Sequence, residues 1–282
     1  MPTSKQKNKP KLPKKIALLA GAGMLPRMIY ESCQKKDIEC LIIGVEGHIS
    51  TELYEGIEYS SLPIYSLSSI VKTIHDRKIK NIVLAGKVNR TGISRLLLDA
   101  KGIKLFTTII RNGMSDNAIL TSVIKFFESE GFTILSSETI ADDLIMPLGN
   151  LTKHININAN AKKDIKQGLQ ILRGISAYDV GQSLVIQNSL VLGVEAAEGT
   201  DQLIKRCMNI AQESGDRPVL IKICKPTQDT RVDLPCIGPN TIIEMHKSGI
   251  QGIAIEAGKA LILEKQKTIE EAEKLGVFVY GI

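Results

Sequence analysis

Acidic and basic side chains lie close together in the second half of this 282-residue sequence, near the ends of two apolar runs. Hard cations such as Mg²⁺ prefer carboxylate oxygens and keep several waters, whereas Lys and Arg complement phosphate oxygens. A reaction at a diphosphate needs groups of both kinds. The residues concerned are Glu195, Glu198, Thr200 and Asp201 after the first run, and Lys222, Lys225, Asp229, Arg231 and Asp233 around the second.

An alternative interpretation of the same residues requires no ligand. Thr200 and Asp201 stand where they would cap a following helix, and the charges of the segment 225–239 can pair with one another in water. That segment is nevertheless very polar for a connection between two core elements, and long irregular loops in compact domains are often functional. Spacing alone does not separate the two interpretations.

A glycine turn in the first half offers a second candidate site. Gly21, Ala22 and Gly23 lie between the end of an apolar run and the start of a helical segment, where backbone N–H groups favour an anion such as phosphate. Pro26 replaces the third glycine of the dinucleotide-binding fingerprint. Glu46, at the end of the second expected strand, stands where NAD-binding proteins have the acid that binds the ribose. The turn therefore predicts a phosphate or nucleotide site, with an NAD site and a purely structural tight turn as alternatives.

Lys87, Asn89 and Arg90 follow the third expected strand of the first half. They come at the carboxyl end of that strand, which is the edge where open α/β sheets bind ligands. These side chains are expected to clamp phosphate or sugar groups. The alternative is a solvated loop of ordinary polar residues.

Histidine and cysteine chemistry has no support in the sequence. The four histidines, His48, His75, His154 and His246, include no i, i+4 pair, so neither a histidine metal site nor a Ser-His-Asp triad is indicated. The five cysteines are widely spaced and form no CxxC pair. We expect them to be reduced structural thiols.

Short apolar runs alternate with segments of helical period, which is typical of parallel strands joined by right-handed crossovers. Strands are expected at 16–20, 40–45 and 81–85 in the first half, and at 183–186, 190–194, 219–224, 252–255 and 260–263 in the second. Between the two halves of the chain, around Pro147 and Gly149, the sequence loses its apolar periodicity. The predicted fold is α/β, with a Rossmann-like domain with a parallel sheet (16–146), a linker (147–158) and a second, catalytic α/β domain (159–282).

Residues 1–15 carry the whole formal charge of +6, because this segment holds six lysines and no acid. The rest of the chain is neutral, and its aromatic content of 4% is low, so a nucleic-acid surface is not indicated. No apolar stretch after the lysines resembles a secretory signal, and we expect a cytoplasmic protein. The segment is expected to be a disordered basic tail; attraction to anionic lipid head groups is the alternative.

Six segments together resemble the LpxI-type UDP-2,3-diacylglucosamine pyrophosphatases. They are spread from residue 21 to residue 258, so the resemblance extends over nearly all of the chain after the lysine-rich tail, and the match is specific. The segments are DVGQ (179–182), VEAAEGTD (194–201), KPTQDTRVDLPCIG (225–238), GAGMLP (21–26), AGKVNR (85–90) and EAG (256–258).

The resemblance implies two domains that hold a lipid substrate between them, and Mg²⁺-dependent (or Mn²⁺-dependent) attack of water on the diphosphate of a UDP-linked diacyl sugar. Asp233 corresponds to the essential acid. Metal ligands are expected among Asp233, Asp229, Glu195 and Glu198. The expected substrate-binding residues are Gly21, Ala22, Gly23, Lys87, Asn89, Arg90, Gln182, Thr200, Asp201, Lys222, Lys225 and Arg231.

The implied products are UMP and 2,3-diacylglucosamine 1-phosphate, as in lipid A biosynthesis. A homodimer is expected, and the acylated substrate allows peripheral contact with the inner membrane. The main alternative is a nucleotide-sugar- or NAD-binding Rossmann protein without hydrolase activity. A non-enzymatic interaction protein is a weaker alternative, because the polar segment 225–239 has no evident use as a mere surface.

Overall fold

The chain divides between Asp142 and Asp143 into two compact units in a computed structural model. The structure describes residues 12–88, 93–176, 178, 180–212, 215–226 and 228–282. Both units are layered α/β folds, which confirms the predicted fold class. No helix within the described ranges combines the length and the hydropathy that a membrane-spanning segment requires.

The first unit is built on a parallel five-stranded sheet in the order β3-β2-β1-β4-β5. Its neighbouring strands β1 and β4 begin the two halves of the sheet, as in Rossmann folds, so their carboxyl ends form the switch point where ligands commonly bind. The strands are β1 (Lys15–Ala20), β2 (Glu39–Val45), β3 (Ser60–Leu62), β4 (Asn81–Ala85) and β5 (Thr133–Leu135).

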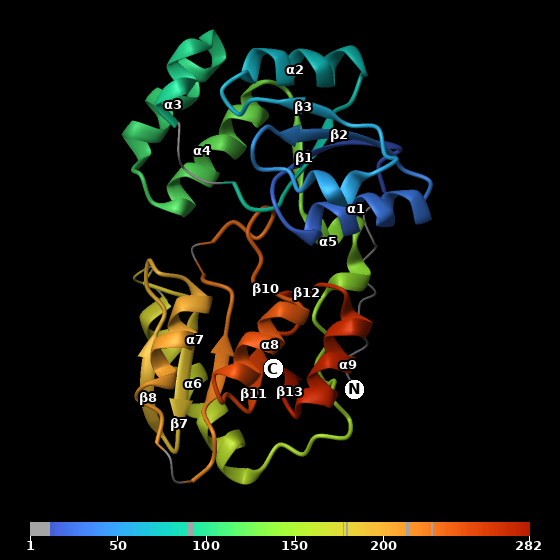
Figure 1. Cartoon of the computed structure of the whole chain (residues 1–282). Coiled ribbons are helices and arrows are strands. Elements are labelled where there is room, and N and C mark those ends of the chain that lie inside the picture. Colours follow the sequence, from blue (N-terminus) through green and yellow to red (C-terminus); the bar gives the residue numbers. More distant parts are fainter. Residues whose placement is uncertain (1–11, 89–92, 177, 179, 213–214, 227) are drawn as a thin grey trace, which may run out of the picture. The chain divides into compact units, whose positions relative to one another are not determined.

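Helices cover both faces of this sheet, with α1 and α2 on opposite sides (Figure 1). The α-helices are α1 (Met24–Lys35), α2 (Leu67–Asp76), α3 (Ala100–Asn112), α4 (Asp116–Ser129) and α5 (Ser137–Ile140). The 3₁₀ helices η1 (Thr51–Tyr54) and η2 (Ile93–Leu98) complete this unit, and η3 (Asp142–Leu144) begins at its last residue. The strands expected at 16–20, 40–45 and 81–85 lie in β1, β2 and β4.

The second unit contains a mixed six-stranded sheet in the order β6-β13-β11-β9-β7-β8, beside a two-stranded ribbon of β10 and β12. Its strands are β6 (Gly149–Asn150), β7 (Ser183–Gln187), β8 (Leu190–Val194), β9 (Val219–Lys222), β10 (Cys236–Ile237), β11 (Gly252–Ile255), β12 (Leu261–Ile262) and β13 (Phe278–Gly281). Its helices are α6 (Ala159–Ser176), α7 (Thr200–Met208), α8 (Pro239–Lys247) and α9 (Lys265–Leu275).

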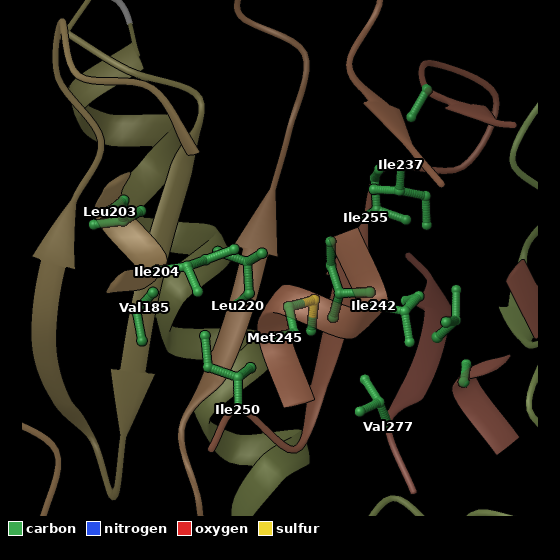
Figure 2. Close-up of a cluster of buried hydrophobic side chains, with 14 of the residues drawn as sticks. Val185, Leu203, Ile204, Leu220, Ile237, Ile242, Met245, Ile250, Ile255 and Val277 are labelled. Atoms are coloured by element: carbon green, nitrogen blue, oxygen red, sulfur yellow. The ribbon is translucent and has the colours of Figure 1, made fainter. Parts of the chain in front are cut away.

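Side chains that alternate along the strands divide the second core into two layers. Val185, Leu220 and Ile253 pack against α7, α8 and α9, and Figure 2 shows this cluster around Ile204, Ile242 and Met245. Their strand neighbours Leu184, Ile221 and Ala254 instead pack against α6. The layers fix the sheet between helices on both faces, so its strand ends are left to carry polar groups.

The segment 147–158, predicted as a linker, contributes to the second unit. Gly149 and Asn150 form β6, which pairs antiparallel with β13. Thr152 is buried, and its hydroxyl accepts a hydrogen bond from Val279 N at 3.1 Å. This segment therefore forms an edge of the second sheet.

Candidate active site

One edge of the second sheet gathers the polar residues singled out in the sequence. β8, β9, β11 and β13 all end there, and the antiparallel strand β7 begins there. Ser183 is paired in register with Lys222, and Lys222 with Ile255, the residue before Glu256. Glu195 follows β8, and its amide donates to Ser183 O at 2.8 Å. Residues distant in the sequence therefore meet because their strands end together.

The hydroxyl of Thr200 contacts three of these residues. Lys222 Nζ lies 3.1 Å from Thr200 Oγ1, which lies 3.2 Å from Glu195 Oε2 and 3.2 Å from Ser183 Oγ. An ammonium only donates and a carboxylate only accepts, so the single hydroxyl hydrogen of Thr200 points to Glu195. Thr200 Oγ1 then accepts from Lys222 and from Ser183. The arrangement is a hydrogen-bonded chain that runs from Lys222 through Thr200 to Glu195.

Lys222 is a buried cation without a carboxylate in direct contact among the described residues. The residue is 7% exposed. Within the described part of the chain, Thr200 Oγ1 is its only side-chain partner, and no carboxylate lies within 4.0 Å of Nζ. An ammonium has three donors, and a buried charge is costly unless it is paired. This geometry suits a group that receives an anion from outside the protein.

The electrostatic surroundings of Cys236 connect Asp233 with the same edge of the sheet. Burial raises the pKa of the Cys236 thiol to about 11, while the positive charge of Lys222 lowers this pKa and the negative charge of Asp233 raises it. The thiol therefore lies within electrostatic reach of both. The backbone of Asp233 is fixed by a hydrogen bond from its amide to Asp229 O at 3.1 Å. The predicted catalytic carboxylate and the buried ammonium thus belong to one neighbourhood.

Asp229 and Arg231 form a local pair in the polar segment. Arg231 donates to both carboxylate oxygens of Asp229, from Nε to Oδ1 at 3.0 Å and from Nη2 to Oδ2 at 2.8 Å. These hydrogen bonds hold the pKa of the Asp229 carboxyl below its ordinary value. Asp229 therefore orients the guanidinium of Arg231, a group that suits phosphate.

Two more predicted residues have defined surroundings. The amide of Lys225 donates to Gln228 Oε1 at 3.2 Å, which fixes the backbone where the segment leaves β9. Gln182 Oε1 is buried and has no hydrogen-bond partner among the described residues. A buried acceptor of this kind usually has a partner, so Gln182 is suited to receive a donor from a ligand.

The four predicted metal ligands are not gathered into one protein site. Glu198 bonds to Arg206, with Oε1 3.1 Å from Nε, and Asp229 bonds to Arg231. Hydrogen bonds from its own backbone amide and from Arg206 lower the pKa of the Glu198 carboxyl. Among the described residues, no three His, Cys, Asp or Glu side chains are grouped so that they could hold a metal ion.

The backbone amides of the glycine turn in the first unit donate hydrogen bonds to acceptors of the protein itself. Gly21 N donates to Ala85 O, Ala22 N to Lys87 O and Gly23 N to Ser50 Oγ, at 2.8, 2.9 and 3.0 Å. A Cβ on Gly21 would lie 2.7 Å from Lys87 O, so the close backbone approach requires glycine. These three amides therefore favour the structural alternative over the phosphate cradle or the NAD site.

Lys87 lies at the switch point beside that turn, bridged to Ala22. Asn89 and Arg90 fall outside the described residues. Asp201 lies in the first turn of α7, where its charge favours the helix dipole, and it is exposed. Substrate binding by these residues stays a prediction.

The sequence models of two domains match this chain: the LpxI N-terminal domain over residues 15–144 and the LpxI C-terminal domain over residues 147–280. The chain belongs to the LpxI family. Among curated proteins of that family, UDP-2,3-diacylglucosamine pyrophosphatase LpxI from Caulobacter vibrioides is 33% identical over 279 residues, which cover 95% of this chain and 98% of that protein.

Two solved structures outside the LpxI family match only weakly. Phosphoribosylglycinamide synthetase from Anaerococcus prevotii is 15% identical with a TM-score of 0.22, over 71% of this chain and 43% of that one. The biotin carboxylase domain of a 2-oxoglutarate carboxylase from Hydrogenobacter thermophilus is 12% identical with a TM-score of 0.21, over 70% and 40%. Scores at this level carry no argument about the LpxI fold.

Sequence reasoning missed Ser183 and Glu256 in this LpxI-family site. Ser183 supplies a hydroxyl to the chain around Thr200, and Glu256 Oε2 accepts from Cys224 N at 3.2 Å, which fixes the exit of β9. The only signal for Ser183 was a polar residue at the start of an apolar strand. Glu256 was visible only as part of a family motif.

The burial of Lys222 predicts that Lys222→Met makes the folded protein more stable. Met keeps an unbranched chain and removes a buried charge, and hydrophobic replacement of buried charges often stabilises by about 1 kcal/mol or more. Thr200 Oγ1 keeps its bond from Ser183. Thermal and urea unfolding measure the effect, with the exposed Lys247→Met as the control that stays within about 0.5 kcal/mol. A less stable Lys222→Met protein would show that the ammonium is structural.

Proposed function

We propose that the chain hydrolyses UDP-2,3-diacylglucosamine to UMP and 2,3-diacylglucosamine 1-phosphate. The observation that carries the proposal is the buried ammonium of Lys222 beside Thr200 and Glu195, within a chain matched over nearly its whole length by a relative named for that activity. Buried cations without an acidic partner are suited to a dianionic linkage such as a diphosphate. Hydrolysis adds one water and breaks one bond between phosphorus and the bridging oxygen.

The basic side chains of this edge would hold the diphosphate. Lys222 would donate its remaining hydrogens to phosphate oxygens, and the Thr200–Glu195 pair orients its ammonium. Arg231, held in place by Asp229, would contribute a planar pair of donors. Lys225 lies three residues after the end of β9 and completes the basic set. Donors fixed before the reaction stabilise charge that develops on the leaving phosphate, without reorganisation at the moment of bond breaking.

A divalent cation fits the donor set if the diphosphate supplies part of its coordination. Mg²⁺ usually keeps several waters and binds one or two carboxylates together with substrate phosphates. Asp233 is the carboxylate for which we propose this role, because its charge and that of Lys222 both act on the Cys236 thiol. When bound, Mg²⁺ or Mn²⁺ would neutralise charge on the diphosphate oxygens.

Asp233 would act on the attacking water, either by accepting its hydrogen bond or by holding the cation beside it. Gln182 Oε1 would accept a hydrogen bond from the substrate. The homodimer and the cytoplasmic location expected from the sequence stay predictions.

Metal-dependent release of UMP tests the proposed reaction. Purified full-length protein should release UMP from detergent-dispersed UDP-2,3-diacylglucosamine when Mg²⁺ or Mn²⁺ is present, because a bound cation would neutralise the negative charge of the diphosphate before water attacks. In oxygen-18 water, one label should enter UMP or the sugar phosphate. Undiminished turnover in excess chelator would contradict the metal proposal, and absence of turnover at every metal concentration would contradict the hydrolase itself.

Asp233→Asn should lower kcat by about 100-fold or more and affect substrate affinity less, because the lost carboxylate acts mainly in the transition state. Asp229→Asn is the matched control in the same segment. It loosens Arg231, which contacts phosphate in the ground state too, so KM should rise more than kcat falls. Steady-state kinetics and melting curves for both variants measure this. A normally folded Asp233→Asn protein with wild-type kcat would remove Asp233 from the mechanism.

A further inference from the structure

Exposed apolar side chains are concentrated on η2 and α3 of the first unit. Leu98 is 77% exposed and Ile110 is 58% exposed, while Leu97, Ile103 and Met114 are each about half exposed. Ile103 and Ile110 are seven residues apart and therefore lie on one face of α3. The opposite face of α3 buries Leu105 and Ile109. We call the exposed side chains of Leu97, Leu98, Ile103, Ile110 and Met114 the η2–α3 surface.

This surface is held rigidly on the domain. Asp99 caps α3 by accepting from Lys101 N and Gly102 N at 2.8 and 2.9 Å, and it also accepts from Ser68 at the start of α2. Burial acts to raise the pKa of the Asp99 carboxyl, and these hydrogen bonds outweigh burial and lower it. A Cβ on Gly102 would lie 2.2 Å from Leu96 O, so η2 packs directly on α3. The apolar side chains are presented in a fixed arrangement.

Basic residues flank the η2–α3 surface. Arg95, Lys101, Lys104 and Arg111 come from η2 and α3, and the acid of this segment, Asp99, is bonded to backbone amides. Glu130 of the neighbouring chain segment pairs with Lys101 and, at 3.7 Å, with Lys104. With the exposed Asp116, which follows Met114, three acids face the four basic groups, and the surface keeps a small positive balance. Exposed apolar groups beside basic ones are typical of elements that lie on anionic membranes.

We propose that the η2–α3 surface docks the protein on an anionic lipid bilayer. Leu98 and Ile110 would enter the interface between head groups and acyl chains, and Arg95 and Arg111 would face the lipid phosphates. In a symmetric dimer the same positive surface would meet itself, so charge favours lipid over a second copy. The biological role of this docking rests on the proposed function, because the proposed substrate carries two acyl chains and would lie in the membrane. The exposed apolar and basic residues of the surface are observed independently of that function.

Vesicle flotation with the full chain tests the proposal. The protein should float with vesicles of phosphatidylcholine containing phosphatidylglycerol and much less with phosphatidylcholine alone. Leu98→Ser/Ile110→Ser should weaken binding to the anionic vesicles at least tenfold. The matched control is Leu190→Ser/Ile210→Ser, a similarly exposed pair in the second unit, which should bind as the wild type does. A further variant replaces Lys5, Lys7, Lys9 and Lys11 by Gln and should retain most of the binding.

Three results would overturn the docking proposal. These are unchanged vesicle binding in Leu98→Ser/Ile110→Ser, binding that is lost only in the lysine variant, and a change of oligomeric state without a change in vesicle binding. Release of UMP from detergent-dispersed substrate should be unchanged in Leu98→Ser/Ile110→Ser, and a raised KM there would assign the surface to the acyl chains instead. A protein that binds vesicles normally but releases no UMP would contradict only the proposed function.

Discussion

The hydrogen bond between Lys222 and Thr200 is the interaction on which the second unit's site depends. It places an ammonium inside the protein with a hydroxyl as partner, a choice that costs stability unless an anion is bound. Glu195 makes the hydroxyl an acceptor toward Lys222 by taking its only hydrogen. The cation is thereby oriented without being neutralised by direct contact, and its remaining donors stay available to phosphate.

The strand order of the second unit brings Lys222, Thr200 and Glu195 together. Lys222 ends β9, Glu195 follows β8 and Thr200 begins α7, so β7, β8 and β9 must share one edge in their observed register. Two apolar layers hold the sheet rigid behind this edge. The polar segment after β9 then returns through the Asp229–Arg231 pair to Asp233 and Cys236. The two apolar layers stabilise the folded unit, whereas the buried charged groups that lower its stability lie at the edge of the sheet.

Much of the fold was predictable from local pattern. The apolar runs at 16–20, 40–45 and 81–85 identify three parallel strands, because buried strands read as continuous apolar stretches. β3 and β5 have three residues each, which is too short for a periodicity signal, and η2 and α3 were not predicted from the sequence. The site was predictable as a list of residues but not as a geometry. Glu198 and Asp229 look like metal ligands in sequence, yet each faces an arginine that the fold brings to it. The amides of Gly21 and Ala22 look available, but they bond to the carbonyl oxygens of Ala85, the last residue of β4, and of Lys87.

The central claim is that Thr200 acts on the substrate through Lys222. A double-mutant cycle in kcat/KM with Thr200→Val, Lys222→Met and the combined variant measures this directly, after melting curves have shown that each protein is folded. We expect strong non-additivity: Thr200→Val should lower kcat/KM in the wild-type background and have almost no effect once Lys222 is replaced. Effects that add within about 0.5 kcal/mol would show that the two residues act independently, and would contradict the account.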